Sequence, residues 1–134
     1  MGAALSIALP LHPVPSYARI TGVRVDRCTL TSVVGGGCAV FAYLPLSASV
    51  AVLLSDVSVS SASALSRGVA VFLDAVATAT VTGLRCLATA TSAGDGGCIA
   101  VSGSLLVTLD SIVGTQSYAR SGSGAVAWLS GSTT

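Results

Sequence analysis

One short phrase occurs four times in this chain: a glycine, then a small residue, then an apolar alternation. It covers residues 36–40, 67–71, 96–101 and 123–127. The equivalent positions Cys38, Val69, Cys98 and Ala125 follow one another at nearly equal intervals, which shorten slightly along the chain. A repeat of this length is typical of proteins whose units stack on one another. The repeat therefore restricts the fold more than any local signal does.

The residue types within the repeats favour strands over helices. Apolar residues make up 52% of the chain and charged residues only 8%, whereas about 25% charged residues is usual in soluble domains. Small and β-branched residues predominate, and these pack well on pleated sheets. Lys and Glu, which are good formers of surface helices, are absent. We therefore expect an all-β protein, and its net charge of +1 gives no electrostatic footprint for nucleic acid.

Each repeat contains two or three short strand patterns and a corner rich in Gly and Ser. One such unit cannot bury its apolar face alone, but stacked units can, with equivalent strands paired in parallel about 4.8 Å apart. The sequence therefore predicts a right-handed parallel β-helix of about four coils. An antiparallel β-sandwich is the alternative. The expected repeats are 19–37, 38–68, 69–97, 98–124 and a partial unit 125–134, after an irregular segment 1–18 that contains three of the four prolines.

The offset from each glycine corner also predicts one inward column of stacked side chains. Val40, Val71 and Val101 are its expected members, and Ala127 or Val126 would begin the next level. Every second residue of a strand points to the same face, so a column of this kind would lie in the core.

The Gly-Gly-Cys-Ile phrase at 96–99, the apolar alternation after it and the Ser/Gly-rich return resemble the repeat of polymorphic-membrane-protein-type β-helices. That family pairs a Gly-Gly-Ala-Ile phrase with a Phe-x-x-Asn phrase, and this chain lacks the second because it has no Asn. The Ala/Val/Ser-rich composition of residues 47–91 is similar to that of the dispersed-gene-family surface proteins of trypanosomes. Those are long surface glycoproteins with β-helical ectodomains, although this chain has no acceptor for N-glycosylation.

The resemblance covers about residues 19–129 and implies a non-enzymatic scaffold at the cell surface or secreted, acting in adhesion. Its partner would be a host or matrix protein or a glycan, with membrane attachment only through regions outside this chain. It implies a fragment of a longer repeat protein and carries over no catalytic, cofactor-binding or metal-binding residue. Two alternatives stay open: a fragment of a carbohydrate-active β-helix enzyme, and a membrane-embedded segment around residues 38–54.

The cysteines form two similar pairs, Cys28 with Cys38 and Cys86 with Cys98. A zinc site is not expected, because no pair is closely spaced and the single histidine, His12, is distant in sequence. In the expected register, Cys38 and Cys98 share a column two coils apart, as do Cys28 and Cys86. About 9.6 Å then separates them, which exceeds the Cα separation of a disulfide. Any disulfides should therefore be Cys28–Cys38 and Cys86–Cys98, while the slightly favoured alternative is four unpaired core cysteines.

Three aspartates and one arginine are candidates for a charged ladder across successive coils. Asp26, Asp56 and Asp110 are expected at neighbouring positions, with Arg85 in the third repeat. A carbohydrate-active enzyme would need such carboxylates to converge in a groove. Solvated surface charge is the simpler interpretation, and we expect no enzyme activity.

Hydroxyl side chains form a second candidate ladder, and two aromatic residues near the end of the chain are candidates for a contact site. The hydroxyl phrases are Thr29-x-Thr31, Ser58-x-Ser60 and Thr89-x-Thr91, and a regular hydroxyl ladder on a flat sheet can bind sugars or ice. The aromatic residues are Tyr118 and Trp128, for which packing of the terminal coil is the alternative role.

The ends of the stack are expected to associate with further copies of the chain. A stacked repeat protein needs polar caps over its open strand edges. The last apolar stretch, 125–129, is followed only by small polar residues, and the edges carry few charges. We therefore expect end-to-end self-association.

Overall fold

The computed structural model describes residues 5–7, 16–31, 37–43, 50–92 and 94–131, and these residues form strands and turns but no helix. The prediction of an all-β protein is confirmed for this part of the chain. The strands are β1 (Leu5–Ile7), β2 (Ser16–Thr21), β3 (Arg24–Leu30), β4 (Val40–Tyr43), β5 (Val50–Ser55), β6 (Ser58–Ala64), β7 (Val71–Asp74), β8 (Thr78–Thr82), β9 (Arg85–Thr91), β10 (Ile99–Ser102), β11 (Leu106–Asp110), β12 (Val113–Thr115), β13 (Tyr118–Ala119) and β14 (Ala127–Ser130).

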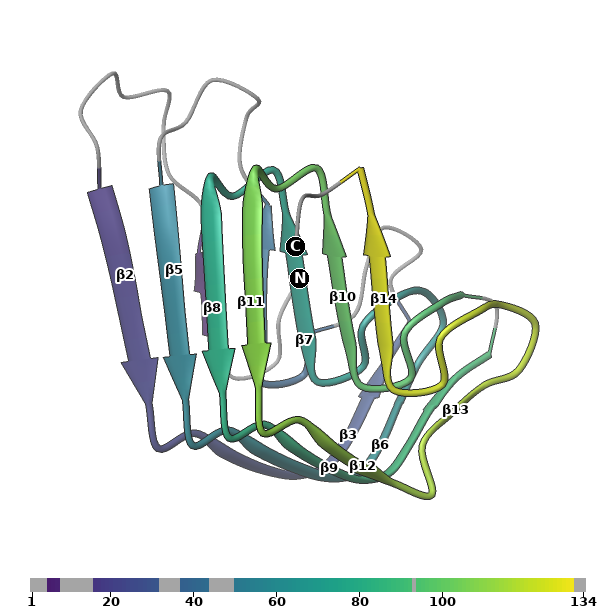
Figure 1. The fold of residues 1–134 in the computed structure, drawn as a ribbon. Helices are drawn as coiled ribbons and strands as arrows, with labels where there is room; N and C mark the ends of the chain where they lie inside the picture. The colour runs from purple at the N-terminus through teal and green to yellow at the C-terminus, as the bar shows by residue number, and fades with distance from the viewer. Residues whose placement is uncertain (1–4, 8–15, 32–36, 44–49, 93, 132–134) are drawn as a thin grey trace.

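The strands form three parallel sheets. Sheet A has the order β1-β4-β7-β10-β14, sheet B the order β11-β8-β5-β2, and sheet C the order β12-β9-β6-β3, with β13 also paired to β9. The chain passes from sheet A to sheet B to sheet C and then returns to sheet A beside the strand it used before (Figure 1). Every pairing between the described strands is parallel, so the alternative of an antiparallel sandwich is wrong.

The strand register shows the repeat directly. We call the stretch of chain from one strand to the next strand of the same sheet a pass. In sheet A, Val71 pairs with Ile99, and Ile99 pairs with Ala127, so these two passes are equal in length. The first pass through sheet B is longer, because Ser16 pairs with Val50. The extra residues fall between strands, which leaves the pairing itself unchanged.

The expected column of Val40, Val71 and Val101 is wrong in its last member. Val40 pairs with Val71, and Val71 pairs with Ile99, whereas Val101 pairs with Leu73. The glycine corners give the same register, since Val40, Val71 and Ile99 each come three residues after Gly37, Gly68 and Gly96. Gly68 donates its backbone N–H to the carbonyl of Gly96 at 3.1 Å, so Gly96 is the equivalent corner residue and not Gly97. Val101 is still fully buried, in the neighbouring column two residues further along the strand.

The segment 1–18 is not an irregular leader to the repeats, as the sequence suggested. It supplies β1 and the first half of β2, which pair with β4 and β5 respectively. In the sequence, the prolines at 10, 13 and 15 come after Ile7 of β1 and before Ser16 of β2. Those prolines and His12 lie outside the described residues.

The corners are built from backbone in the left-handed region. The described residues with positive φ have values between 52° and 85°, and each falls in one of four columns that the register defines. One column precedes sheet A, one follows it, one separates sheets B and C, and one bends sheet C. The columns are Gly37, Gly68, Gly96 and Gly124; Ala75, Gly103 and Gly131; Gly22, Asp56, Gly83 and Ser111; and Arg27, Ser61, Ala88 and Gln116.

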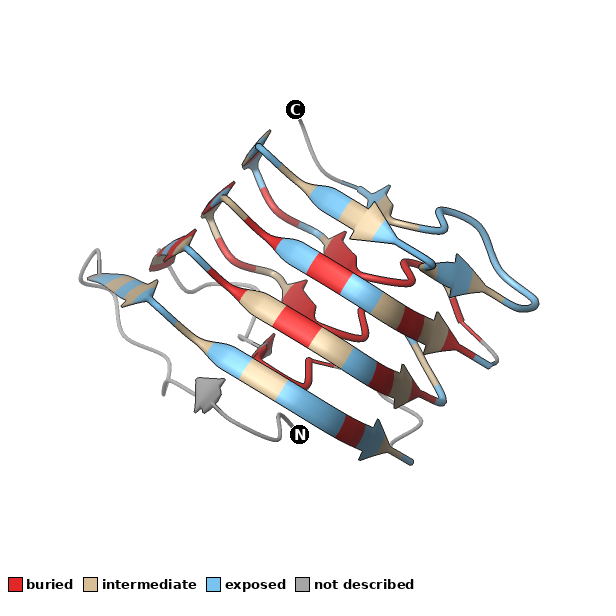
Figure 2. Cartoon of the chain, turned by 90° about the horizontal axis from the view of Figure 1, so that it is seen from below, coloured by how far each residue is buried: buried red, intermediate tan, exposed pale blue. Residues whose placement is uncertain are grey.

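The inward faces of the three sheets share one apolar core. Val71 of sheet A, Val52 of sheet B and Val59 of sheet C are all at most 1% exposed and belong to the same cluster. Along the strands, buried residues alternate with more exposed ones, and the strands at both ends of the stack are more exposed than those in the middle (Figure 2). In the last pass Leu106 alternates with the buried Val107 along β11, so it faces outward and is 47% exposed. Val113 pairs with the exposed Arg85 and is 51% exposed.

Two disulfides link sheet C to the start of the next strand of sheet A. Cys28 is bonded to Cys38 with a Cα–Cα distance of 6.1 Å, and Cys86 to Cys98 with 5.9 Å. These are the two pairs that the sequence allows, and the alternative of four unpaired cysteines is not found in the structure. All four side chains are at most 8% exposed.

The columns assumed for the cysteines were nevertheless wrong. Ala70 donates its backbone N–H to the carbonyl of Cys98 at 2.8 Å, while Cys38 donates to Val69, so Cys98 is one residue out of the column of Cys38. Cys28 pairs with Ala62, whereas Cys86 pairs with Val59, which comes earlier in the same strand. The two bonds therefore leave sheet C at different points, because Cys28 is the fifth residue of β3 and Cys86 the second residue of β9.

Candidate functional site

A groove of about 350 Å³ crosses the ends of three neighbouring strands of sheet C, β3, β6 and β9, and reaches β13. It runs along the stack, perpendicular to the strands. Its lining is mostly hydroxyl and apolar side chains with one arginine and one tyrosine. The lining residues are Thr29, Leu30, Thr31, Ser63, Ala64, Leu65, Ala90, Thr91, Ser92, Tyr118 and Arg120.

The floor of the groove is a continuous backbone ladder. Leu65 donates its N–H to the carbonyl of Leu30, Ser92 donates to Ala64, and Arg120 donates to Thr91, each at 3.0 Å. These bonds continue the parallel pairing beyond the ends of the strands. The side chains above the floor are therefore held at the spacing of neighbouring strands, about 4.8 Å.

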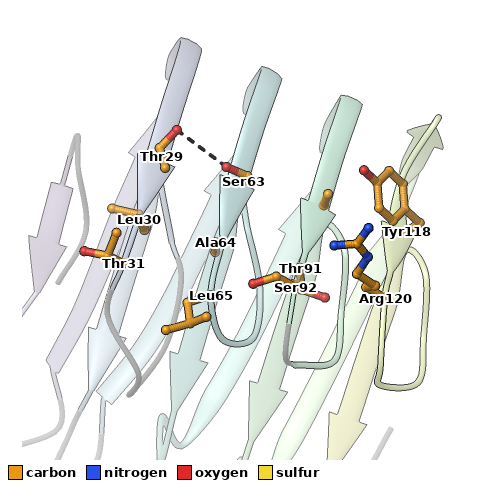
Figure 3. A pocket seen from close by; sticks show the side chains of 11 residues that line it. Thr29, Leu30, Thr31, Ser63, Ala64, Leu65, Thr91, Ser92, Tyr118 and Arg120 are labelled. Atoms are coloured by element: carbon orange, nitrogen blue, oxygen red, sulfur yellow. Dashed lines mark hydrogen bonds between the residues drawn. The ribbon is translucent and has the colours of Figure 1, made fainter.

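The register places the lining side chains in rows. Thr29 pairs with Ser63, Ser63 with Ala90, and Ala90 with Tyr118, so these four side chains form one row across the sheet. The Ser63 hydroxyl donates to the Thr29 hydroxyl at 3.5 Å. Figure 3 shows this contact at one end of the groove and the Tyr118 ring beside Arg120 at the other. One end of the groove thus offers hydroxyls and the other an aromatic ring, which is 56% exposed, and a guanidinium.

A second hollow of about 400 Å³ lies at the opposite end of the same strands. Arg24, Ser58 and Arg85 begin β3, β6 and β9, and they pair with one another in that order. Asp56 and Gly83, from the corner before these strands, also line it. Sheet C therefore has a hollow at each end, and the left-handed residues Arg27, Ser61, Ala88 and Gln116 lie between the two.

The hydroxyl ladder expected from the sequence is only partly present. Thr29 pairs with Ser63 and not with Ser58, which pairs instead with Arg24. Thr89 and Thr91 are fully buried. Thr89 shares a 2.8 Å hydrogen bond with Ser117, and the Thr91 hydroxyl donates to the carbonyl of Gly94 at 2.6 Å. The error arose because a longer stretch of chain separates β3 from β6 than separates β6 from β9, so equal-looking phrases are not equivalent.

The aspartates expected at neighbouring positions are in three different columns. Asp26 pairs with Ser60, which donates a 2.7 Å hydrogen bond to its carboxylate. Asp110 pairs with Thr82 in sheet B. Asp56 lies at the corner between sheets B and C. Within the described part of the chain, no three His, Cys, Asp or Glu side chains are grouped in a way that could hold a metal ion.

The two aromatic candidates separate in the structure. Tyr118 lines the groove, whereas Trp128 lies in sheet A and packs against a small cluster formed by Phe72 and Ala100. Ser63, Ser92 and Arg120 were missed as groove residues. The signal that would have found Arg120 is its place one pass beyond Ser92, which follows from the pairing of Tyr118 with Ala90.

These observations define an all-β repeat protein of parallel sheets with a groove along the stack. No family model, no curated protein and no solved structure matches the chain. Among the described residues there is no helix that is long and apolar enough to cross a membrane. The described parts of the candidate membrane segment 38–54 form β4 and β5, and residues 44–49 of it lie outside the described residues.

Proposed function

We propose that the chain is a segment of a right-handed parallel β-helix that acts as a non-enzymatic binding scaffold and binds an extended glycan in the groove of sheet C. The helical path is supported by the order in which the chain visits the three sheets and by their shared core. Right-handedness follows from the strong general preference of connections between parallel strands of one sheet.

The observation that carries the binding proposal is the row of hydroxyls that ends at an exposed tyrosine. A sugar ring has an apolar face and a rim of hydroxyls, so it can stack on the Tyr118 ring and exchange hydrogen bonds with Thr29, Ser63 and Ser92. The groove continues from strand to strand along the stack, which suits a linear chain of sugars better than a single small molecule. Because the ladder below is fully paired, little ordering of the protein is needed on binding.

A secreted or cell-surface location is part of the same proposal. Disulfides form and persist mainly in oxidising compartments. Both of the disulfides here are almost completely buried, so they are part of the core. Attachment to a membrane, if the protein has one, would come from regions outside this chain.

Binding to an array of linear oligosaccharides tests the proposal. The parent chain should bind at least one class of linear glycan, and Tyr118→Ala should weaken that binding at least about tenfold, equivalent to about 1.4 kcal/mol. Tyr17→Ala is the matched control, because Tyr17 is 76% exposed on β2, in a different sheet, and is not among the residues that line the groove. Binding by Tyr118→Ala equal to that of Tyr17→Ala would overturn the assignment of the groove. Absence of binding to every glycan tested would overturn the function.

A further inference from the structure

The hollow at the start of sheet C brings two arginines together on one face. Arg24 and Arg85 lie on either side of Ser58, each in register with it, and both are exposed. Two strand spacings put their backbones about 9.6 Å apart, and both side chains line the same hollow. The described ion pairs join Arg27 to Asp26 and Arg67 to Asp95, so neither arginine of the hollow is engaged in one.

Ser58 sits on a fixed backbone between these arginines. Its N–H donates to the carbonyl of Val23 at 2.8 Å, and the N–H of Arg85 donates to the carbonyl of Val57 at the same distance. The backbone of Ser58 is therefore held in register between two cationic side chains. A hydroxyl donor flanked by two guanidinium groups is suited to an oxyanion, because guanidinium forms paired, charge-assisted hydrogen bonds.

Asp56 adds a carboxylate to the lining of the same hollow. It lies at the corner, with a φ of 53°, and its Oδ1 would be 3.4 Å from a Cβ placed on Gly83. Its side chain lines the same hollow as the two arginines. A carboxylate repels a free inorganic anion but accepts hydrogen bonds from hydroxyl groups.

We propose that Arg24, Ser58 and Arg85 bind the sulfate ester or carboxylate of an acidic sugar, while Asp56 accepts a hydrogen bond from one of its hydroxyls. The site is separate from the groove at the other end of the strands, and it stands even if the groove binds nothing. A free inorganic anion satisfies the arginines but not Asp56. The combination of charges therefore selects an anion that is attached to a polyol.

Ligand-observed NMR at low protein concentration tests this proposal, with glucose 6-sulfate and glucuronate as probes. Glucose is the neutral match, and inorganic sulfate is the competitor. The parent chain should bind at least one acidic probe saturably, and glucose at least tenfold more weakly. Arg85→Gln and Ser58→Ala should each weaken binding of the acidic probe, the first at least tenfold. Arg19→Gln should stay within twofold of the parent, because Arg19 is an exposed arginine of sheet B.

The variant Asp56→Asn distinguishes an acidic sugar from a free inorganic anion as the ligand of this site. This variant should bind the acidic sugar more weakly, because it loses the carboxylate that accepts the sugar's hydroxyl. Inorganic sulfate should compete more strongly, because a repelling charge is replaced by a neutral amide. If Asp56→Asn strengthens the binding of the acidic sugar and of inorganic sulfate equally, the site binds free anions and the sugar assignment is wrong. If neither acidic probe binds, or Arg19→Gln loses as much binding as Arg85→Gln, the proposal is overturned.

Discussion

The guanidinium carbon of Arg67 lies 4.4 Å from the centroid of the Trp128 ring, although β7 and β10 both come between these residues in the chain. The Nε of Arg67 is also 3.5 Å from a carboxylate oxygen of Asp95, whose side chain is only 20% exposed. The other carboxylate oxygen of Asp95 accepts a hydrogen bond from the backbone N–H of Ser123. Three successive passes of the chain are therefore joined by one polar and aromatic contact on the outside of sheet A.

Arg67→Ala should destabilise the chain by about 1–1.5 kcal/mol, since it removes a cation–π contact and a partly exposed ion pair together. It should also change the fluorescence of Trp128, the only tryptophan. Urea denaturation followed by that fluorescence measures both effects. Arg19→Ala, at an exposed position of β2, is the control and should stay within about 0.5 kcal/mol of the parent. Equal stability of the two variants would show that the contact does not hold the passes together.

Two glycines of the corner columns separate backbone strain from steric contact. Gly22 and Gly68 have φ values of 71° and 63°. A Cβ on Gly22 would meet nothing within 4 Å, whereas one on Gly68 would collide with the Val71 carbonyl and lie 2.9 Å from the Ala100 nitrogen. Gly22→Ala should therefore cost about 1–2 kcal/mol from backbone strain alone.

Gly68→Ala should cost clearly more than Gly22→Ala, because the atoms that it would meet are backbone and cannot rotate away. Chemical denaturation of the two variants under one condition gives the difference. If Gly68→Ala loses no more stability than Gly22→Ala, the chain does not pack this closely before β7.

The same columns predict a stabilising substitution at Ala75. It has a φ of 57° where the following passes have Gly103 and Gly131. Ala75→Gly should relieve about 1–2 kcal/mol of left-handed strain at an entropic cost of about 0.5–1 kcal/mol, for a net gain of about 0.5–1 kcal/mol. Ala51→Gly, within β5 and without a positive φ, should instead lose stability. A thermal melt that ranks the two variants the other way would contradict the corner geometry.

The repeat, the strand class and the pairs of cysteines could be predicted from the sequence, whereas the register could not. Periodic glycines fix where the chain turns, and alternation fixes which residues face inward. The length of a pass varies along the chain, however, because the turns between strands differ in length. Ile99 occupies the column of Val71, and Val101 lies two residues further along, in the column of Leu73.

The groove escaped prediction for the same reason. Thr29, Ser63 and Tyr118 become neighbours only when passes of unequal length are aligned by their hydrogen bonds. Their side chains carry no common motif along the chain. A site assembled across strands from different passes is therefore visible only in the paired structure.

The disulfides should be identified by mass mapping of a digest prepared without reduction. The linked peptides should contain Cys28 with Cys38 and Cys86 with Cys98, as in the structure. Each bond closes a short loop, so its removal should cost roughly 3 kcal/mol. Under oxidising conditions, the double variant Cys86→Ser/Cys98→Ser should be less stable than the parent by this amount. On reduction, the variant should lose only the stability that the Cys28–Cys38 bond contributes. A peptide that links Cys38 to Cys98 would contradict the register described above.

Exposed apolar side chains at the last coil should make the isolated chain associate. Leu105 is 77% exposed and Val113 51% exposed, and β11, β12 and β14 are the outermost described strands of their sheets. Such edges carry unpaired backbone groups that can add a further strand. Sedimentation velocity across a concentration series should show oligomers that grow with concentration. Lysine at edge positions opposes strand addition, so Leu105→Lys/Val113→Lys should shift the distribution toward monomer.

Leu87→Lys is the control for this experiment, because Leu87 is 49% exposed but lies within β9, between β6 and β12. It replaces one exposed apolar side chain without touching an edge, so it should leave the association unchanged. If Leu87→Lys disperses the oligomers as well as the edge variant does, association occurs through the faces of the sheets. A single monomer species for the parent at high concentration would show that these edges do not recruit another chain.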